Sequence, residues 1–352
     1  MGRPVPEIST EALDAAHMRG TLQAVVNRRF GAGTALGTVE VERFERRLLR
    51  YTLEISAAGG SARPWHLIGK VYDTSELGHR GFSGIHRLWT GGFADSPPLS
   101  LRIPEPYTYV PGLRLLLMEQ VPGRSLKKLV RKKTAASEHM RMFGAAMAKL
   151  HASPRLSDDP FTLDDHLETR CASLADSLAS AFVDLAEPVR RIVDTARAQE
   201  ARAGDEALSV AHGDFHLAQV QIADDRLWIL DLDPLHVGDP AYDVAMALFA
   251  LKQLEEKTAD NDYVASLRDA FVAAYFDRVD WSVASRVPVQ EALIHLKRAC
   301  KRFRYQDEDG WEDTVRKQIG QAVACLDAGR DIGQPRSVAE VATLYRRCPA
   351  TV

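Results

Sequence analysis

The residues best suited to chemistry lie in one short segment, residues 212–233. Asp214 ends a His-Gly-Asp loop that begins at His212, and Gln219 lies five residues further on. A short predicted hairpin then leads to Asp231, at the end of an apolar run. The segment offers a candidate base, Asp214, and two oxygen ligands for a hard cation. Such a set suits transfer of a phosphoryl group from a nucleotide, which needs positioning and charge neutralisation more than covalent catalysis.

A further candidate, Lys70, lies much earlier in the chain, in the mostly apolar run 65–72 that predicts a strand. Its ammonium group can act as a point charge toward nucleotide phosphates. Each residue also has a plainer interpretation, because a strand lysine can be an edge residue with its head in water and a loop aspartate is often a turn or cap residue. The joint order of Lys70, Asp214, Gln219 and Asp231 favours the catalytic interpretation. Asp233 is a further candidate for metal or substrate.

The elements that must position these residues divide the chain in two. Apolar and polar residues alternate over 49–55, and residues 107–118 have the pattern of a hairpin. Helical periodicity begins after residue 123 and continues to the end, interrupted by the segment with Asp214. We therefore predict an α+β fold with a small antiparallel-sheet N-lobe over residues 1–118, a hinge over 119–123 and a larger, mainly helical C-lobe over 124–352. A ligand site between the lobes is the default expectation.

The composition excludes several classes of protein. The chain has 352 residues, of which 45% are hydrophobic and 26% charged, as in ordinary globular proteins. A net charge of -3 argues against nucleic acid or anionic membrane as a partner, and no apolar run is long enough to span a bilayer. The four cysteines lack CxxC spacing, so they predict neither a zinc site nor a disulfide framework. With no signal-peptide pattern, we expect a cytoplasmic protein with reduced thiols.

The segment around Asp214 resembles the signature of the aminoglycoside phosphotransferase and choline kinase family, which has a protein-kinase-like fold. Lys70 resembles the family's phosphate-binding lysine, and residues 148–151 resemble the helix end ahead of its catalytic loop. Residues 115–123 resemble the hinge that holds adenine through backbone groups. The matching signature residues are His212, Gly213, Asp214, Asp231, Gly238, Asp239, Pro240 and Asp243.

The resemblance implies a Mg2+-dependent kinase that uses ATP, or GTP, to phosphorylate an alcohol on a small molecule such as an aminoglycoside, a sugar or choline. The roles it implies fall on Asp214 and His212 for catalysis, Gln219 and Asp231 for the metal, and Lys70, Glu119 and Val121 for the nucleotide. Two alternatives stay open. One is a kinase acting on Ser or Thr of a peptide in a biosynthetic pathway, and the other is a nucleotide-binding module without efficient catalysis.

Three departures from the family pattern support the second alternative. Gln219 stands where the family usually has Asn, with a stem one methylene longer. No glycine loop lies between the first two predicted strands, where the turn carries Arg46 and Arg47 instead. The acidic partner of the lysine has no clear match, because Glu76 follows closely and His86 is not a carboxylate.

Charges near the C-terminus bear on the acceptor. Lys297, Arg298, Lys301 and Arg302 fall on one face of a predicted helix, and an acidic stretch, 307–313, follows. A basic surface would favour an anionic group or an acidic peptide, whereas an acidic one would favour a polycation. Local ion pairs between the two runs would cancel both effects. The charge pattern alone therefore selects no acceptor.

Overall fold

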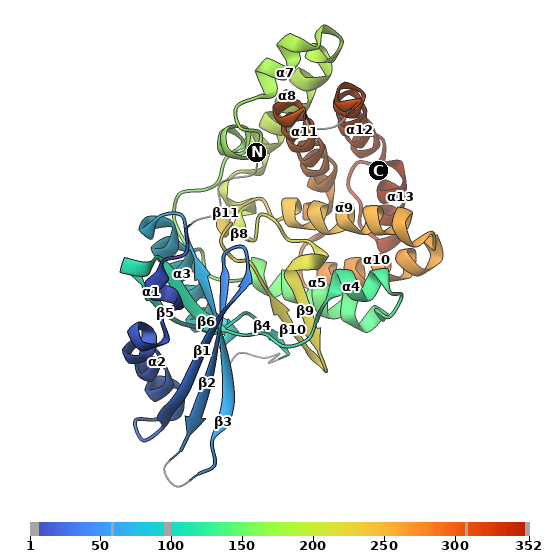
Figure 1. Ribbon diagram of the computed structural model, residues 1–352. Coiled ribbons are helices and arrows are strands. Elements are labelled where there is room, and N and C mark those ends of the chain that lie inside the picture. The colour runs from blue at the N-terminus through green and yellow to red at the C-terminus, as the bar shows by residue number, and fades with distance from the viewer. Residues whose placement is uncertain (1–6, 58–59, 95–99, 307–308, 349–352) are drawn as a thin grey trace. The chain divides into compact units, whose positions relative to one another are not determined.

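The computed structural model describes residues 7–57, 60–94, 100–306 and 309–348. The chain divides into two compact units, Met1–Pro122 and Gly123–Val352. An antiparallel sheet dominates the first unit and helices dominate the second (Figure 1). The predicted fold class is therefore confirmed, and the two units are called the N-terminal and C-terminal units below.

A five-stranded antiparallel sheet, in the order β1-β2-β3-β6-β5, forms the N-terminal unit. The strands of this unit are β1 (Ala35–Glu45), β2 (Leu48–Ser56), β3 (Arg63–Val71), β4 (Leu101–Arg102), β5 (Pro106–Val110) and β6 (Leu115–Glu119). The predicted hairpin is confirmed as β5 and β6, which a short turn, Pro111–Leu113, connects. Lys70 lies near the end of the central strand β3, opposite Leu48 of β2 and Leu116 of β6.

The helices of this unit were only partly predicted. They are α1 (Thr10–Leu13), α2 (Ala15–Phe30) and α3 (Ser75–Leu88). The sequence pattern of the first third predicted mainly strands, but α2 buries Met18, Leu22 and Val25 at helical spacing and packs them against the core of the sheet. Helix α3 starts at Ser75, where the Thr74 side chain caps it by accepting from the backbone N–H of Leu77.

The C-terminal unit is mainly helical, as predicted. Its longer helices are α4 (Leu126–Arg131), α5 (Ser137–His151), α7 (Ala175–Ala181), α8 (Ala186–Ala203), α9 (Ala241–Thr258), α10 (Asn261–Phe276), α11 (Val287–Tyr305), α12 (Trp311–Ile332) and α13 (Val338–Arg347). Phe143 of α5 stacks on Phe271 of α10 with ring centroids 5.0 Å apart. Helices α11 and α12 run side by side (Figure 1). None of the described helices is both long and apolar enough to cross a bilayer.

Short strands in the C-terminal unit shape the segment that carries Asp214. They are β7 (Arg124–Ser125), β8 (Ser209–Ala211), β9 (Val220–Ala223), β10 (Arg226–Ile229) and β11 (His236–Gly238). Strands β9 and β10 form a hairpin, and β8 pairs with β11. The segment that carries Asp214 thus leaves β8, passes through the β9–β10 hairpin and returns along β11 into α9. All four cysteines are buried and free.

Candidate active site

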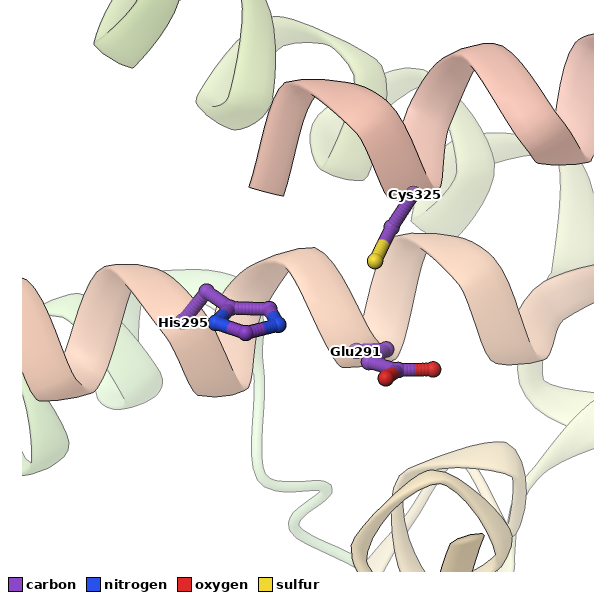
Figure 2. A group of neighbouring side chains, drawn as sticks. All are labelled: Glu291, His295 and Cys325. Carbon is purple, nitrogen blue, oxygen red and sulfur yellow. The ribbon is translucent and has the colours of Figure 1, made fainter. Parts of the chain in front are cut away.

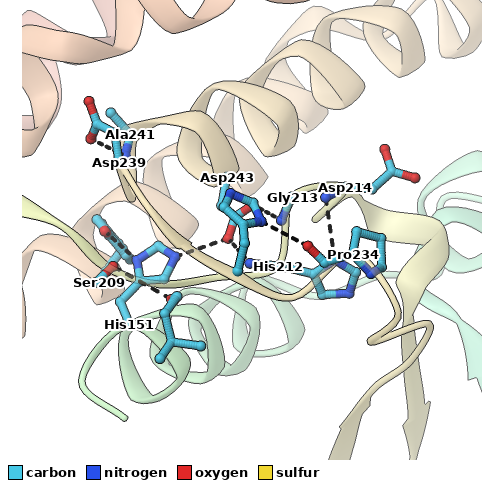
Figure 3. Close-up of polar contacts among 12 residues, drawn as sticks. His151, Ser209, His212, Gly213, Asp214, Pro234, Asp239, Ala241 and Asp243 are labelled. Atoms are coloured by element: carbon cyan, nitrogen blue, oxygen red, sulfur yellow. Dashed lines mark hydrogen bonds and ion pairs between the residues drawn. The ribbon is translucent and has the colours of Figure 1, made fainter. Parts of the chain in front are cut away.

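The loop that presents Asp214 is held by a buried carboxylate, Asp243 in the first turn of α9 (Figure 3). Its Oδ2 atom accepts the backbone N–H of His212 at 2.6 Å, and its Oδ1 atom accepts that of Gly213 at 2.9 Å. The Nε2 atom of His151 lies 3.1 Å from Oδ2 of Asp243, and its Nδ1 atom lies 2.8 Å from the Tyr275 hydroxyl. Asp243 therefore fixes the backbone of the loop directly ahead of Asp214.

The protonation of Asp243 follows from these contacts. The side chain is wholly buried, and burial alone raises the pKa of a carboxyl. The hydrogen bond from His151 and the backbone N–H of His212 outweigh burial and lower the pKa of Asp243 to about 2. The carboxylate form, which accepts all three hydrogen bonds, is thus the form that holds the loop at neutral pH.

His212 contacts the protein rather than the open space around Asp214. Its ring is fully buried and stacks on Phe215 with centroids 4.8 Å apart. The Nε2 atom lies 2.8 Å from the carbonyl oxygen of Leu230, and Nδ1 accepts the backbone N–H of Asp214 at 3.4 Å. We predicted His212 as a catalytic residue, but a ring in this place acts through the loop, so we assign it a positioning role.

Gly213 is needed for the shape of the loop. Its φ of 80° lies in the left-handed region that side-chain-bearing residues seldom adopt. A Cβ atom at this position would lie 2.7 Å from the His236 ring and 2.8 Å from the guanidinium of Arg170. The residue before Asp214 therefore has to be glycine for both conformational and steric reasons.

Asp214 itself projects away from Asp243, with 36% of its side chain exposed (Figure 3). The Nε2 atom of His216 lies 3.8 Å from one of its carboxylate oxygens. Burial lowers the pKa of His216, and the charge of Asp214 partly offsets that effect. Because Nδ1 of His216 accepts the backbone N–H of Ala218 at 3.2 Å, the neutral ring carries its proton on Nε2, the nitrogen facing Asp214. The Asp214 carboxylate thus lies beside the His216 ring and is still accessible to a ligand.

The two predicted metal ligands are neighbours in the structure. Gln219 and Asp231 lie 12 positions apart in sequence, and Nε2 of Gln219 donates to Oδ2 of Asp231 at 3.3 Å. The backbone carbonyl of Gln219 also accepts the N–H of Leu230 at 2.8 Å, which ties the two segments together. Asp231 has a φ of 54°, a conformation that aspartate tolerates better than most residues. A half-turn of the Gln219 amide would present its oxygen beside the Asp231 carboxylate, so the donor set fits a hard cation.

The predicted nucleotide-binding residues belong to the N-terminal unit. Lys70 is half-buried, with its Nζ atom 5.8 Å from the centre of the Tyr72 ring. The backbone N–H of Glu119 donates to the carbonyl of Glu105 at 2.9 Å, so the backbone of Glu119 can contact a base only through its carbonyl oxygen, as an acceptor. Val121 follows the end of β6 and is half-exposed.

The departures noted in the N-terminal unit are visible in its geometry. The His86 ring lies against Phe82, with ring centroids 5.6 Å apart. Arg47, in the turn between β1 and β2, forms an ion pair with Asp73 at 3.0 Å. The tight turn between β1 and β2 carries arginines rather than a glycine loop.

A cavity of about 560 Å³ opens beside Asp214 within the C-terminal unit. Helices α4, α9, α11 and α12 and the loop after Asp214 supply its lining. The predicted basic face of α11 is confirmed, since all four of its residues line this one cavity: Lys297, Arg298, Lys301 and Arg302. Of the acidic stretch that follows, residues 307–308 lie outside the described part of the chain. Lys127 and Lys257 are further lining residues that the sequence did not single out.

A second buried polar group lies where α11 packs against α12 (Figure 2). The ligand atoms of Glu291, His295 and Cys325 all lie within 4.8 Å of one another. The ammonium of Lys252 already bonds the Glu291 carboxylate, and Nδ1 of His295 lies 2.8 Å from the Gln318 amide oxygen. This group is therefore a charge-compensated part of the helical core, and we assign it a structural role.

The comparison with protein families identifies residues 91–285, more than half of the chain, as a phosphotransferase enzyme family domain. No curated protein matches the sequence significantly. Among solved structures, a choline/ethanolamine kinase family protein from Mesorhizobium loti is 15% identical, with 94% of this chain and 99% of that chain covered and a TM-score of 0.51. An ethanolamine kinase from Plasmodium vivax is 9% identical, with 90% of each chain covered and a TM-score of 0.55.

An aminoglycoside phosphotransferase from Streptomyces rimosus, in complex with ADP and streptomycin, is 17% identical over 80% of this chain and 98% of that chain, with a TM-score of 0.52. At such low identities these structures establish the fold, which is the protein-kinase-like fold that the sequence predicted. The family match covers the loop of Asp214 and Asp243, the buried carboxylate that holds this loop. It also covers the neighbouring Gln219 and Asp231. The chain therefore belongs to the phosphotransferase enzyme family.

Proposed function

We propose that this kinase moves the γ-phosphoryl group of ATP, or of GTP, to a hydroxyl of a small molecule, with Asp214 as the catalytic base and Mg2+ as the metal. The observation that carries the proposal is the setting of Asp214. A rigid loop, bonded to a buried carboxylate, presents an accessible carboxylate at the wall of a cavity large enough for a small-molecule acceptor.

Asp214 has the geometry that an alcohol acceptor requires. A carboxylate at a cavity wall can accept the hydrogen bond of a hydroxyl and orient its oxygen for in-line attack. The hydroxyl proton then passes to Asp214 as the new phosphate ester forms. His216, whose Nε2 atom lies 3.8 Å away, can hold the carboxylate in place during this step.

The metal assignment rests on the pairing of Gln219 with Asp231. Both side chains offer oxygen atoms, the ligand type that Mg2+ prefers. When bound, Mg2+ neutralises charge on the transferred phosphates. Lys70 of the N-terminal unit supplies a further positive charge, while the carbonyl of Glu119 and the backbone of Val121 hold the base.

Similar folds support this assignment of reactants. The Streptomyces rimosus structure holds ADP together with streptomycin, and an amicoumacin kinase of the same fold holds AMP-PNP, Ca2+ and its antibiotic. In both, a nucleotide and a small-molecule acceptor occupy one protein. We propose the same pairing of reactants for this chain.

A test compares the wild-type protein with Asp214→Asn, using ATP, Mg2+ and a panel of alcohols. Mass spectrometry should detect one added phosphoryl group on an acceptor, and the variant should lose at least about 100-fold in rate. ATP affinity should stay within a few-fold of wild type. Asp225→Asn serves as the matched control, because Asp225 is a 90% exposed aspartate on the nearby β9–β10 turn.

The outcomes separate the alternatives. Asp214-dependent hydrolysis of ATP without an acceptor would support the enzyme and leave the acceptor open. Nucleotide binding with no turnover in either form would favour a nucleotide-binding module. Equal rates in wild type and Asp214→Asn with the same acceptor would remove Asp214 from the mechanism.

A further inference from the structure

The cavity beside Asp214 has a strongly uneven charge. Four of its cationic side chains come from α11, and Lys127 of α4 and Lys257 of α9 add two more. Asp214 is the one carboxylate among its lining residues in the described part of the chain. The net charge of the protein is -3, so this concentration of positive charge is local and does not reflect the overall composition.

Within the described residues, most of these charges have no ion-pair partner. Across residues 7–57, 60–94, 100–306 and 309–348, no carboxylate forms an ion pair with Lys127, Lys257, Lys297, Arg298 or Lys301. Like charges one helical turn apart repel each other. Burial lowers the pKa of Arg298, and the charge of Arg302 lowers it further. The fold therefore keeps cations together at an energetic cost that an anionic ligand would offset.

The interior of the cavity resembles a built site rather than a solvated helix face. The guanidinium of Arg298 lies 5.1 Å from the centre of the Phe249 ring, which fixes its orientation. Its Nε atom is buried without a hydrogen-bond partner in the described structure. Met246, Phe249 and Ile294 give the cavity an apolar floor, and Tyr305 and Thr314 add hydroxyl groups.

We propose that this cavity is the acceptor site and that it takes a small alcohol carrying an anionic group, either a phosphate ester or a carboxylate. The cations bind the anionic group and leave the acceptor hydroxyl beside Asp214. This inference rests on the proposed function and adds the chemical class of the acceptor. A choline-like or aminoglycoside-like cation would meet repulsion here rather than binding.

The first test measures kcat/KM for acceptor pairs that differ in charge. Suitable pairs are ribose with ribose 5-phosphate and glycerol with glycerol 3-phosphate. Glycerol is also compared with glycerate, whose anionic group is a carboxylate. Choline, streptomycin and an acidic serine peptide complete the panel. We expect the anionic member of at least one pair to exceed the neutral one by about tenfold or more. The phosphate and carboxylate arms show which anionic group the cavity prefers.

The second test reverses single charges on α11. Lys301→Glu places a carboxylate in the cavity, whereas Arg304→Glu makes the same change at an exposed position of the same helix outside the lining. We expect Lys301→Glu to lower kcat/KM for the anionic acceptor by about tenfold and to leave ATP affinity unchanged. Arg304→Glu should behave as wild type. The fold of each variant is checked by its unfolding midpoint.

Calorimetric titration of Asp214→Asn with the same compounds separates this inference from the proposed function. Anion binding that Lys301→Glu weakens in this background supports the anionic site even if no transfer occurs. Robust transfer to choline, streptomycin or the acidic peptide, with no preference for small anionic alcohols, would support the kinase and overturn the anionic site. Equal behaviour of Lys301→Glu and Arg304→Glu would overturn it as well.

Discussion

The carboxylate of Asp243 accepts the backbone N–H of His212 at 2.6 Å, so the first turn of α9 holds the loop that presents Asp214. Removing this clamp in Asp243→Ala leaves two buried N–H groups without a partner. We expect a loss of about 3 kcal/mol in the free energy of unfolding. We also expect kcat to fall by about 100-fold, because a displacement of ~1 Å at a catalytic group costs that much. KM for ATP should change little.

The conservative variant Asp243→Asn separates positioning from folding. Asparagine keeps one acceptor oxygen for the loop, so its kcat should lie between those of wild type and Asp243→Ala. Urea unfolding and steady-state kinetics on the same preparations check both effects. A large change in KM for ATP with an unchanged kcat would contradict the positioning role of Asp243.

The pairing of Gln219 with Asp231 predicts how each controls the need for Mg2+. Asp231→Asn removes the charged ligand, so the Mg2+ concentration for half-maximal activity should rise by about tenfold or more. Gln219→Asn shortens the amide by one methylene but keeps its oxygen, and we expect a change of less than about threefold. Gln219→Leu, which has no ligand atom, should resemble Asp231→Asn. Titration of activity with Mg2+ distinguishes the three variants.

Much of the fold and the loop of Asp214 could be predicted because the signals are local. The alternation in β2, the mostly apolar run of β3 and the order of His212, Asp214 and Asp231 can each be recognised within a short window of sequence. Helix α2 was missed although its buried residues recur with helical spacing. The strand pattern of the following segment outweighed the helical spacing of these residues. With few residues before it, an N-terminal segment gives little basis for choosing between a helical and a strand repeat.

The contacts that hold the site in place could not be predicted, because they join residues that lie far apart in the sequence. His151 reaches Tyr275 across 124 positions and Asp243 across 92. The basic cavity likewise needs Lys127 and Lys257 beside α11, and only the packing of α4, α9 and α11 brings them there. A sequence pattern can place a charge on one helix face, but it does not show which other helices complete the surface.

His166 predicts a loss of stability in mild acid. Burial, followed by the nearby charge of Arg170, lowers the pKa of His166 to about 3. The unfolded chain takes up a proton near pH ~6.5, so stability is full above that pH and falls as the pH drops toward 3. Between these two pH values, His166 alone should make the free energy of unfolding fall by up to about 1.4 kcal/mol per pH unit. Burial also lowers the pKa values of His236 and His295 to about 4, which adds to the loss.

Urea unfolding at several pH values between about 7 and 5 checks this expectation. His166→Gln should show a shallower pH dependence than wild type, because one of the buried imidazoles is gone. His17→Gln, at an exposed position of α2, should keep the wild-type slope. A slope that does not change in His166→Gln would mean that His166 is already protonated in the folded state.

The buried ion pair between Lys252 and Glu291 predicts a strong non-additivity. Both side chains are at most 3% exposed, and Lys252 also lies 5.0 Å from the centre of the Tyr345 ring. Replacing one partner, in Lys252→Met or Glu291→Leu, leaves an isolated charge in the helical core and should cost about 3–5 kcal/mol. The double variant Lys252→Met with Glu291→Leu removes both charges and should recover most of that loss.

A double-mutant cycle in urea measures the coupling between the two residues. The exposed pair of Arg197 and Asp164, 2.9 Å apart, provides the control, and Arg197→Ala should leave the unfolding midpoint unchanged. The cycle also tests the structural role assigned to the group of Glu291, His295 and Cys325. If that group instead held a metal, the double variant would remain destabilised, and added Zn2+ would raise the unfolding midpoint of the wild type but not that of the variant.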